Sequence, residues 1–164
     1  MLDVRIQVLH PLAVLPEYAH PGDAGCDIRS VEAVSIRPGE RALVATGLAI
    51  AVPTGYVGLV HPRSGLAIKH GVTMVNAPGT IDAGYRGEVK VIVINHDLRE
   101  TFEIAVGDRI AQLVFQAVAT AGFRRVEDIT DDADRAAGSD HRGERGFGSS
   151  GRSQMRSNDG TVSA

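Results

Sequence analysis

Several short segments of this 164-residue chain place acidic, basic and amide side chains beside glycines, a combination that can bind a phosphate ester. The most informative is residues 76–88, Asn-Ala-Pro-Gly-Thr-Ile-Asp-Ala-Gly-Tyr-Arg-Gly-Glu. Turn residues stand on both sides of Asp82 and a strong strand pattern follows, so a hairpin is predicted. Its glycines and proline would let the backbone approach a ligand closely. Asp82 could polarise a water molecule and Tyr85 could pack on a sugar; the alternative is an ordinary hairpin with a polar tip.

Two further segments carry charged side chains near predicted turns. Residues 23–28 contain Asp27, whose carboxylate could orient the water shell of a divalent cation, because Mg²⁺ gives up its water reluctantly. A solvated turn is the alternative for this segment. Residues 62–67 begin a short helix, where Ser64 could serve as the cap. The free N–H groups, the hydroxyl and Arg63 could also bind an anion there, and the two interpretations are compatible.

The last two segments are less specific on their own. Residues 107–114 indicate a turn leading into a strand, where the amide of Gln112 could bond to a phosphate or to a water ligand. Residues 142–151 are rich in glycine and serine around an isolated Phe147. They lack the Gly-Lys-Ser/Thr ending and the preceding strand of a Walker phosphate loop. This run is either disordered or an arm whose arginine and two hydroxyls close over a nucleotide triphosphate.

The elements that must position these side chains are predicted to be strands. Strand patterns cover residues 4–9, 34–36, 41–52, 56–61, 88–95, 102–106 and 109–118, and only residues 64–70 look helical. Many short strands with frequent turns are typical of a sandwich or barrel. The continuous β-branched run at 91–94 indicates a strand that is covered on both faces.

Composition excludes several classes of protein. The formal net charge of −3 argues against nucleic acid as a partner. No apolar run approaches the roughly 20 residues that span a membrane, and the N-terminus lacks the cationic and apolar block of a secretory signal. The single cysteine, Cys26, suits a reducing cytosol, so a cytoplasmic location is expected. We interpret Cys26 as a small hydrophobic residue, and the six histidines show no spacing for a shared metal site.

In chain order, the five segments are residues 23–28, 62–67, 76–88, 107–114 and 142–151. They resemble, in this order, the first to fifth motifs of the trimeric dUTPase family, and the resemblance covers roughly residues 1–151. The fit of residues 60–66 and 78–89 suggests a bacterial, actinobacterial type. The resemblance implies an all-β fold, a distorted jelly-roll β-barrel with one short helix and a flexible C-terminal arm. It also implies a homotrimer whose three active sites are each built from all three subunits.

The same resemblance implies a dUTP diphosphatase that needs Mg²⁺ and forms dUMP and pyrophosphate, limiting uracil in DNA and supplying dUMP for dTMP synthesis. Asp82 would be the catalytic base that activates water for attack on the α-phosphate. Asp27 would hold Mg²⁺ through water. Tyr85 would stack beneath the deoxyribose, and Phe147 would lie against the uracil. The full set of implied substrate-binding residues is Arg63, Ser64, Gly65, Asn76, Thr80, Ile81, Asp82, Tyr85, Lys90, Gln112, Arg142, Phe147, Gly148, Ser149 and Ser150.

The expected organisation is a β-barrel core at residues 1–126, a linker and arm with the fifth motif at 127–151, and a disordered tail at 152–164. Three alternatives stay open from the residues alone. They are a dCTP deaminase of the same fold, a non-catalytic nucleotide sensor and a purely structural β-barrel trimer. The partners expected are dUTP and further copies of the chain, with no nucleic acid and no membrane.

Overall fold

The computed structural model describes residues 1–127, and every helix and strand that it records lies in the compact unit of residues 1–121. The second unit begins at residue 122, and its described residues, 122–127, contain neither helix nor strand. The elements are β1 (Arg5–Val8), β2 (Cys26–Arg29), β3 (Val34–Ile36), β4 (Arg41–Ala51), β5 (Tyr56–His61), α1 (Ser64–His70), β6 (Val72–Met74), β7 (Gly79–Ile81), β8 (Glu88–Asn95), β9 (Phe102–Ile104) and β10 (Arg109–Ala117).

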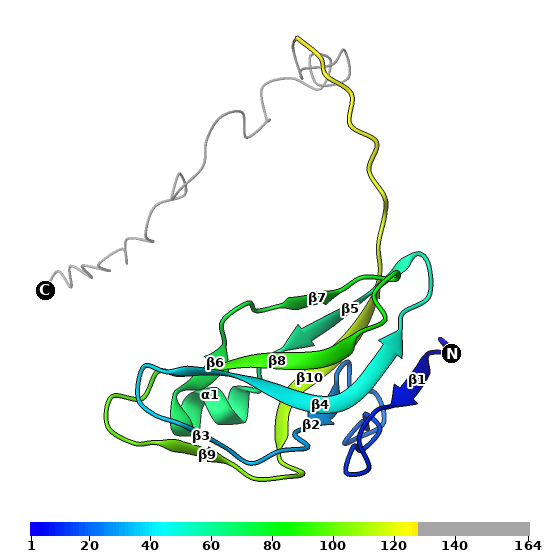
Figure 1. Cartoon of the computed structure of the whole chain (residues 1–164). Coiled ribbons are helices and arrows are strands. Elements are labelled where there is room, and N and C mark those ends of the chain that lie inside the picture. Colours follow the sequence, from blue (N-terminus) through cyan, green and yellow to red (C-terminus); the bar gives the residue numbers. More distant parts are fainter. Residues whose placement is uncertain (128–164) are drawn as a thin grey trace, which may run out of the picture. The chain divides into compact units, whose positions relative to one another are not determined.

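Most of the strand residues lie in two four-stranded antiparallel sheets (Figure 1). The first has the order β1-β4-β8-β6 and the second has the order β2-β10-β5-β7, while β3 and β9 form a small third sheet. Two antiparallel sheets that share one core form the arrangement of a jelly roll. The predicted all-β fold with one short helix is therefore confirmed for the described residues.

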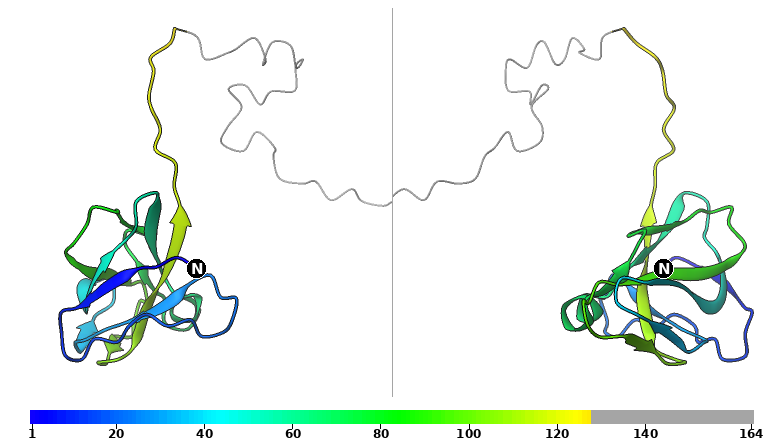
Figure 2. Two further views of the ribbon diagram at one scale, coloured as in Figure 1. Left: turned by 90° about the vertical axis from the view of Figure 1, so that its right-hand side faces the viewer. Right: turned by 60° about the vertical axis from the view of Figure 1, so that its left-hand side comes forward.

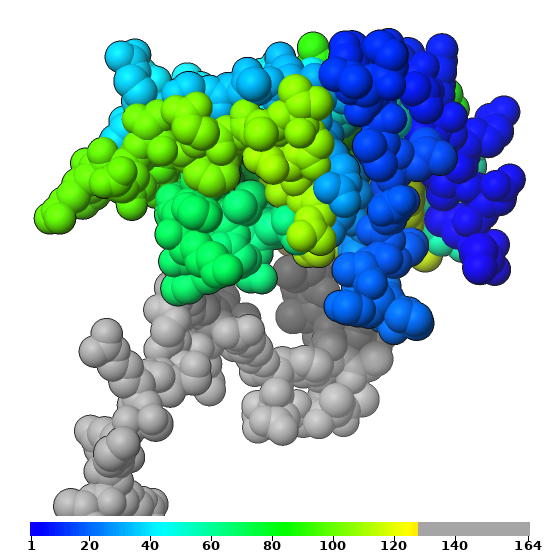
Figure 3. All heavy atoms as spheres, turned by 90° about the horizontal axis from the view of Figure 1, so that it is seen from below, coloured from blue at the N-terminus to red at the C-terminus, as the bar shows by residue number. Residues whose placement is uncertain are grey.

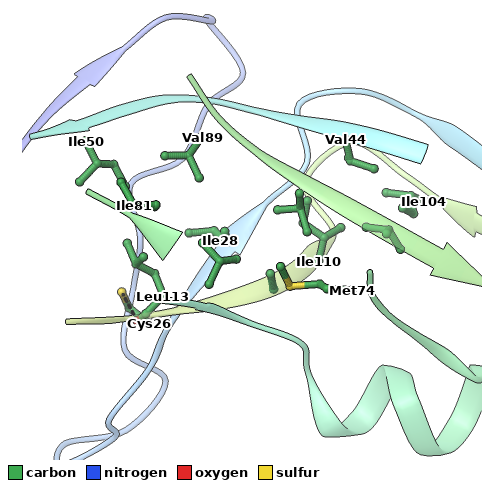
Figure 4. Close-up of a cluster of buried hydrophobic side chains, with 14 of the residues drawn as sticks. Cys26, Ile28, Val44, Ile50, Met74, Ile81, Val89, Ile104, Ile110 and Leu113 are labelled. Atoms are coloured by element: carbon green, nitrogen blue, oxygen red, sulfur yellow. Dashed lines mark hydrogen bonds between the residues drawn. The ribbon is translucent and has the colours of Figure 1, made fainter. Parts of the chain in front are cut away.

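The core lies between the two large sheets (Figure 4). Val44 and Val89 from the first sheet and Ile28 and Leu113 from the second point into the same apolar space. Cys26 also belongs to this core: it is 3% exposed, its S–H donates to the Leu113 carbonyl at 3.3 Å, and burial raises the pKa of its thiol. The interpretation of Cys26 as a small hydrophobic residue agrees with this position.

Strand β8 alternates between a buried face and a half-buried face. Val89, Val91 and Val93 are 4% exposed or less, whereas Ile92 and Ile94 on the other face are partly exposed. The β-branched run predicts that both faces of this strand are covered, but residues 1–127 cover only the inner face. The outer face is therefore an apolar surface that these residues leave partly exposed.

Segments far apart in the sequence meet on the surface of this fold. Figure 2 shows β1 at the edge of its sheet, beside β4. On the face shown in Figure 3, the N-terminal residues, the β3 and β4 region, α1 and the β9 region lie side by side. Residues that could do chemistry are thus brought together by sheet pairing and not by closeness in the sequence.

One local prediction is wrong. Residues 76–88 are not a hairpin, because β7 pairs with β5 in the second sheet and β8 pairs with β4 and β6 in the first. The chain between β7 and β8 is a corner that crosses from one sheet to the other. Asp82 therefore sits where the two sheets separate.

Candidate active site

One cluster of polar side chains forms around Asp27 on β2. Strand β10 lies between β2 and β5, and its residue Gln112 pairs with Asp27 on one side and with His61 on the other. Arg63, just beyond the end of β5, brings its Nε to 3.1 Å from Asp27 Oδ1. Arg109 Nη1 lies 3.3 Å from Oδ2, and Gln112 Nε2 donates to Oδ1 at 3.4 Å. Three of the five sequence motifs therefore meet at one carboxylate that is only 6% exposed.

The contact between Arg63 and Asp27 is an ion pair and not a hydrogen bond. Nε lies within ion-pair distance of Asp27 but has no hydrogen-bond partner among the described residues. The Nη1 of Arg63 instead donates to the backbone carbonyl of Arg109 at 3.2 Å. Two guanidinium groups thus surround one carboxylate, which leaves the cluster with a net positive charge suited to an anion.

The start of α1 differs from the capping interpretation. Arg63 occupies the N-cap position, no side chain caps the helix, and Ser64 is its first residue. Ser64 as the helix cap is therefore wrong. Because Ser64 and Gly65 are exposed beside the arginine cluster, they remain available to an anion.

A second group of polar side chains lines a cavity of about 160 Å³ between β5, β6, β7 and β8. This cavity brings together all six residues that the sequence placed around the base and sugar on the third motif and the following strand. They are Asn76, Thr80, Ile81, Asp82, Tyr85 and Lys90. Residues separated by up to fourteen positions in the sequence thus line one space, and their contact with a base and a sugar stays a prediction.

The corner between β7 and β8 holds Tyr85 in place. The Tyr85 hydroxyl donates to the Glu88 carbonyl at 3.0 Å, and Arg86 Nη1 donates to the carbonyls of Ala83 and Tyr85 at 2.7 and 2.6 Å. A Cβ at Gly87 would lie 2.5 Å from the Tyr85 hydroxyl oxygen, so the ring can take this position only beside a glycine. Sequence and geometry together fix one aromatic ring at the mouth of the cavity.

The two clusters lie far apart within one chain. Ile81, next to Asp82, pairs with Gly58 on β5, and Arg63 lies five residues after Gly58, just beyond the end of β5. At about 3.3 Å per residue, these five residues make the separation about 17 Å. A carboxylate that activates water at a phosphate must lie beside the groups that bind the phosphates. Within residues 1–127 of one chain, these two groups of side chains therefore do not lie beside one another.

Two polar residues at these clusters were not singled out from the sequence, Arg109 and Glu88. Arg109 stands in the fourth motif directly after the Gly107-Asp108 turn, a signal that could have found it, whereas Glu88 gives no signal before its contacts are known. The remaining predicted residues, Arg142, Phe147, Gly148, Ser149 and Ser150, lie outside the described residues.

The dUTPase family model matches residues 12–151. The chain belongs to the dUTPase family. It is 54% identical over 148 residues to a deoxyuridine 5'-triphosphate nucleotidohydrolase of Thermobifida fusca, covering 90% of this chain and 78% of that protein. It is 57% identical over 137 residues to the enzyme of the same name from Leifsonia xyli, covering 84% and 85%. The predicted family and its actinobacterial type are thus confirmed.

Solved dUTPase structures share the fold. A Staphylococcus bacteriophage 80alpha dUTPase with dUPNHPP superposes with a TM-score of 0.81 at 32% identity, covering 93% of this chain and 100% of that one. A dUTPase from phage phi11 of S. aureus, described for its coordination of a structural Mg(II) ion, superposes with a TM-score of 0.74 at 31% identity, covering 79% and 100%. In residues 1–127 of the present dUTPase, no helix is long and apolar enough to cross a membrane.

The donor set of this dUTPase fits Mg²⁺ only if a ligand supplies most of the oxygens. Residues 1–127 contain no group of three or more His, Cys, Asp or Glu side chains that could hold a metal ion. Both oxygens of Asp27 already face guanidinium or amide groups, so a direct metal bond does not suit it. Mg²⁺ commonly keeps several waters and binds through substrate phosphates, which agrees with a carboxylate one shell away.

Proposed function

We propose that this chain hydrolyses dUTP to dUMP and pyrophosphate in the presence of Mg²⁺. The observation that carries the proposal is the cavity between the two sheets, where the residues of the third motif surround one space. Relatives about half identical over most of their length are deoxyuridine triphosphate nucleotidohydrolases, and a structural neighbour holds a dUTP analogue. The chain is accordingly an enzyme of nucleotide metabolism, and its reaction removes dUTP and supplies dUMP.

In the proposed site, Asn76, Thr80 and Ile81 hold the base and the sugar. Tyr85 stacks against the deoxyribose, and its position leaves no room for a 2′-hydroxyl. Asp82 orients and deprotonates the water that attacks the α-phosphorus, while pyrophosphate leaves on the opposite side. This role agrees with the place of Asp82, which is exposed at the cavity that Tyr85 borders.

The cluster around Asp27 is proposed to bind the phosphates. Arg63 and Gln112 share the negative charge of the triphosphate, with Ser64 and Gly65 at the start of α1 beside them. Mg²⁺, held mainly by the phosphates, would neutralise charge on the leaving pyrophosphate. Asp27 keeps the two guanidinium groups in place and would hold that ion through water.

We propose that the dUTPase acts as a homotrimer with shared active sites. The separation of about 17 Å between Arg63 and the Asp82 end of β7 supports this, since a second copy must then bring the phosphate cluster to the catalytic carboxylate. The outer face of the first sheet offers an apolar surface for such contacts. Leu43 is 58% exposed and Val75 is 52% exposed, beside the half-buried Ile92. Closed rings arise when one face of a subunit meets a different face of the next.

The organisation proposed for the whole chain is a core at 1–126, an arm with the fifth motif at 127–151 and a tail at 152–164. Arg142, Phe147 and the residues 148–150 are proposed to close over the bound nucleotide. A cytoplasmic location is proposed as well, and the single buried cysteine supports it.

The deciding experiment is pyrophosphate release from dUTP, dTTP, dCTP and UTP, first with Mg²⁺ and then with EDTA. Release from dUTP alone that stops with EDTA is the expected result. It would test the base pocket, the sugar selection and the metal requirement together. Ammonia from dCTP without pyrophosphate from dUTP would instead identify a deaminase of the same fold, and no reaction on any of the four would identify a binding protein.

A further inference from the structure

The first residue of β8 holds a second carboxylate in the cavity, Glu88, to which the proposed reaction assigns no role. Its side chain is 22% exposed and both of its oxygens have partners. Oε1 accepts the backbone N–H of Gly47 at 2.8 Å, and Oε2 lies 3.2 Å from Lys90 Nζ. The backbone carbonyl of Glu88 accepts the Tyr85 hydroxyl at 3.0 Å. One residue thus contacts two side chains proposed to bind substrate and a neighbouring strand.

The contact with Gly47 fastens β8 to an irregular point of β4. The pairing register shifts between Ala45 and Ala49, so β4 bulges opposite Glu88. Gly47 has a φ of +67°, and a Cβ there would lie 2.7 Å from the Cβ of His10, so the position requires glycine. The N–H of Gly47 donates to the Glu88 carboxylate in place of a ladder carbonyl. A charged acceptor makes this bond stronger than a neutral one would be.

The contact with Lys90 settles which cavity carboxylate holds that cation. Lys90, Glu88 and Asp82 line the same cavity, and the structure pairs Lys90 with Glu88. Among the described residues, no ion pair joins Lys90 to Asp82. A cation beside Asp82 would make that carboxylate a weaker base. Glu88 therefore holds the ammonium, and the proposed base Asp82 has no ion-pair partner among residues 1–127.

We propose that Glu88 is a positioning residue for the sugar end of the pocket and sets the discrimination between dUTP and UTP. It fixes the acceptor that orients Tyr85, and it holds Lys90 away from Asp82. The inference rests on the proposed function, because it concerns the selectivity of the same site. It assigns that selectivity to a residue that is not among the substrate-binding residues implied by the family resemblance.

The test measures kcat/KM for dUTP and for UTP with the full chain, Glu88→Ala and Glu88→Gln. The ratio of the two values does not depend on the fraction of active enzyme, so a general loss of folding leaves it unchanged. Glu88→Ala removes a hydrogen bond to a charged acceptor and an ion pair, and it should lower the ratio about tenfold. Glu40→Gln is the matched control, because it removes a carboxylate paired with Arg37 at 2.6 Å on an exposed turn and should leave the ratio unchanged.

Glu88→Gln keeps an oxygen acceptor for Gly47 and loses only the charge that holds Lys90. It should lower kcat for dUTP about three- to tenfold, and this effect should vanish in a Lys90→Gln background. If Glu88→Ala does not fold, the double-mutant cycle of Glu88→Gln and Lys90→Gln tests the proposal instead. Additive effects of these two substitutions would overturn it.

An unchanged dUTP to UTP ratio in a folded Glu88→Ala variant of an active enzyme would overturn this inference alone. A wild-type chain that does not hydrolyse dUTP would overturn the proposed function and this inference with it.

Discussion

Replacing Asp27 with asparagine should destabilise the protein far more than the removal of an exposed ion pair. The substitution keeps the size of the side chain but removes the charge between Arg63 and Arg109. Breaking a buried pair by removing one partner costs about 3–5 kcal/mol. The side chain of Arg109 is 45% exposed, so water screens its share, and Arg63 is 24% exposed. We therefore expect a loss of about 2–4 kcal/mol in the free energy of unfolding.

The assay is urea denaturation followed by circular dichroism, at one protein concentration because assembly shifts apparent stability. With a slope of about 2 kcal/mol per molar urea, the midpoint should fall by about 1–2 M. Glu40→Gln removes the Arg37 pair, whose 2.6 Å is shorter than either Asp27 contact, yet its side chains are 75% and 47% exposed. It should scarcely move the midpoint, because burial and not distance decides the cost.

A double-mutant cycle sharpens this prediction. Arg109→Gln should cost less in the Asp27→Asn background than in the wild-type chain, since the partner of Arg109 is already neutral. A midpoint for Asp27→Asn within about 0.2 M of the wild type would refute the reasoning. The cluster would then be an exposed, screened group and could not position the arginines for phosphate.

Four further predictions follow from the same structure. Asp82→Asn should lower kcat for dUTP by about 10²–10⁴ with KM little changed, and near-normal turnover would show that Asp82 is not the base. Gly47→Ala should cost about 1–3 kcal/mol by thermal unfolding, because its φ is +67° and its surroundings are full; an unchanged Tm would contradict this. The backbone N–H of Glu100, above all, holds the pKa of Asp97 below its ordinary 3.8, so Asp97 adds stability above about pH 4 that is lost as pH falls through the lowered value. In Asp97→Asn the free energy of unfolding should therefore depend less on pH in the acid range. A dependence identical to that of the wild type would exclude that contribution. A chain that ends before Arg142 should keep its assembly state and lose most of its kcat/KM, and full activity would show that the arm is dispensable.

Within residues 1–127, the sequence predicted seven of the ten strands and the helix. β3, β5 and β8 begin and end at the predicted residues, and β4 and β10 each end one residue earlier than predicted. The strands that the sequence did not predict are β2, β6 and β7, which have three or four residues each, so that little of a hydrophobic period can stand out. They are defined by pairing with distant strands, and that information lies outside any short window of sequence.

The candidate site shows the same division. The residue types led to predictions of chemistry at Asp27, Arg63, Asp82 and Tyr85. The structure brings each of them to a polar cluster, and the roles stay predictions. The sequence could not show that a corner between two sheets, and not a hairpin, presents Asp82, because hairpin and corner use the same turn residues. Nor could composition show that the two clusters are about 17 Å apart within a chain, since that distance follows from the register of β7 on β5.

Both clusters lie where the regular pairing of strands breaks, and this gives a physical reason for their positions. The register shifts between Arg109 and Ala111 beside the Asp27 cluster, and again between Ala45 and Ala49 opposite Glu88. At such a shift the backbone groups lose their ladder partners and side chains take over the hydrogen bonds. Charged side chains that enter the structure to satisfy the backbone are then held in fixed positions at the edge of the core. The two breaks therefore explain why the Asp27 cluster and Glu88 with Lys90 have fixed places beside regular strands.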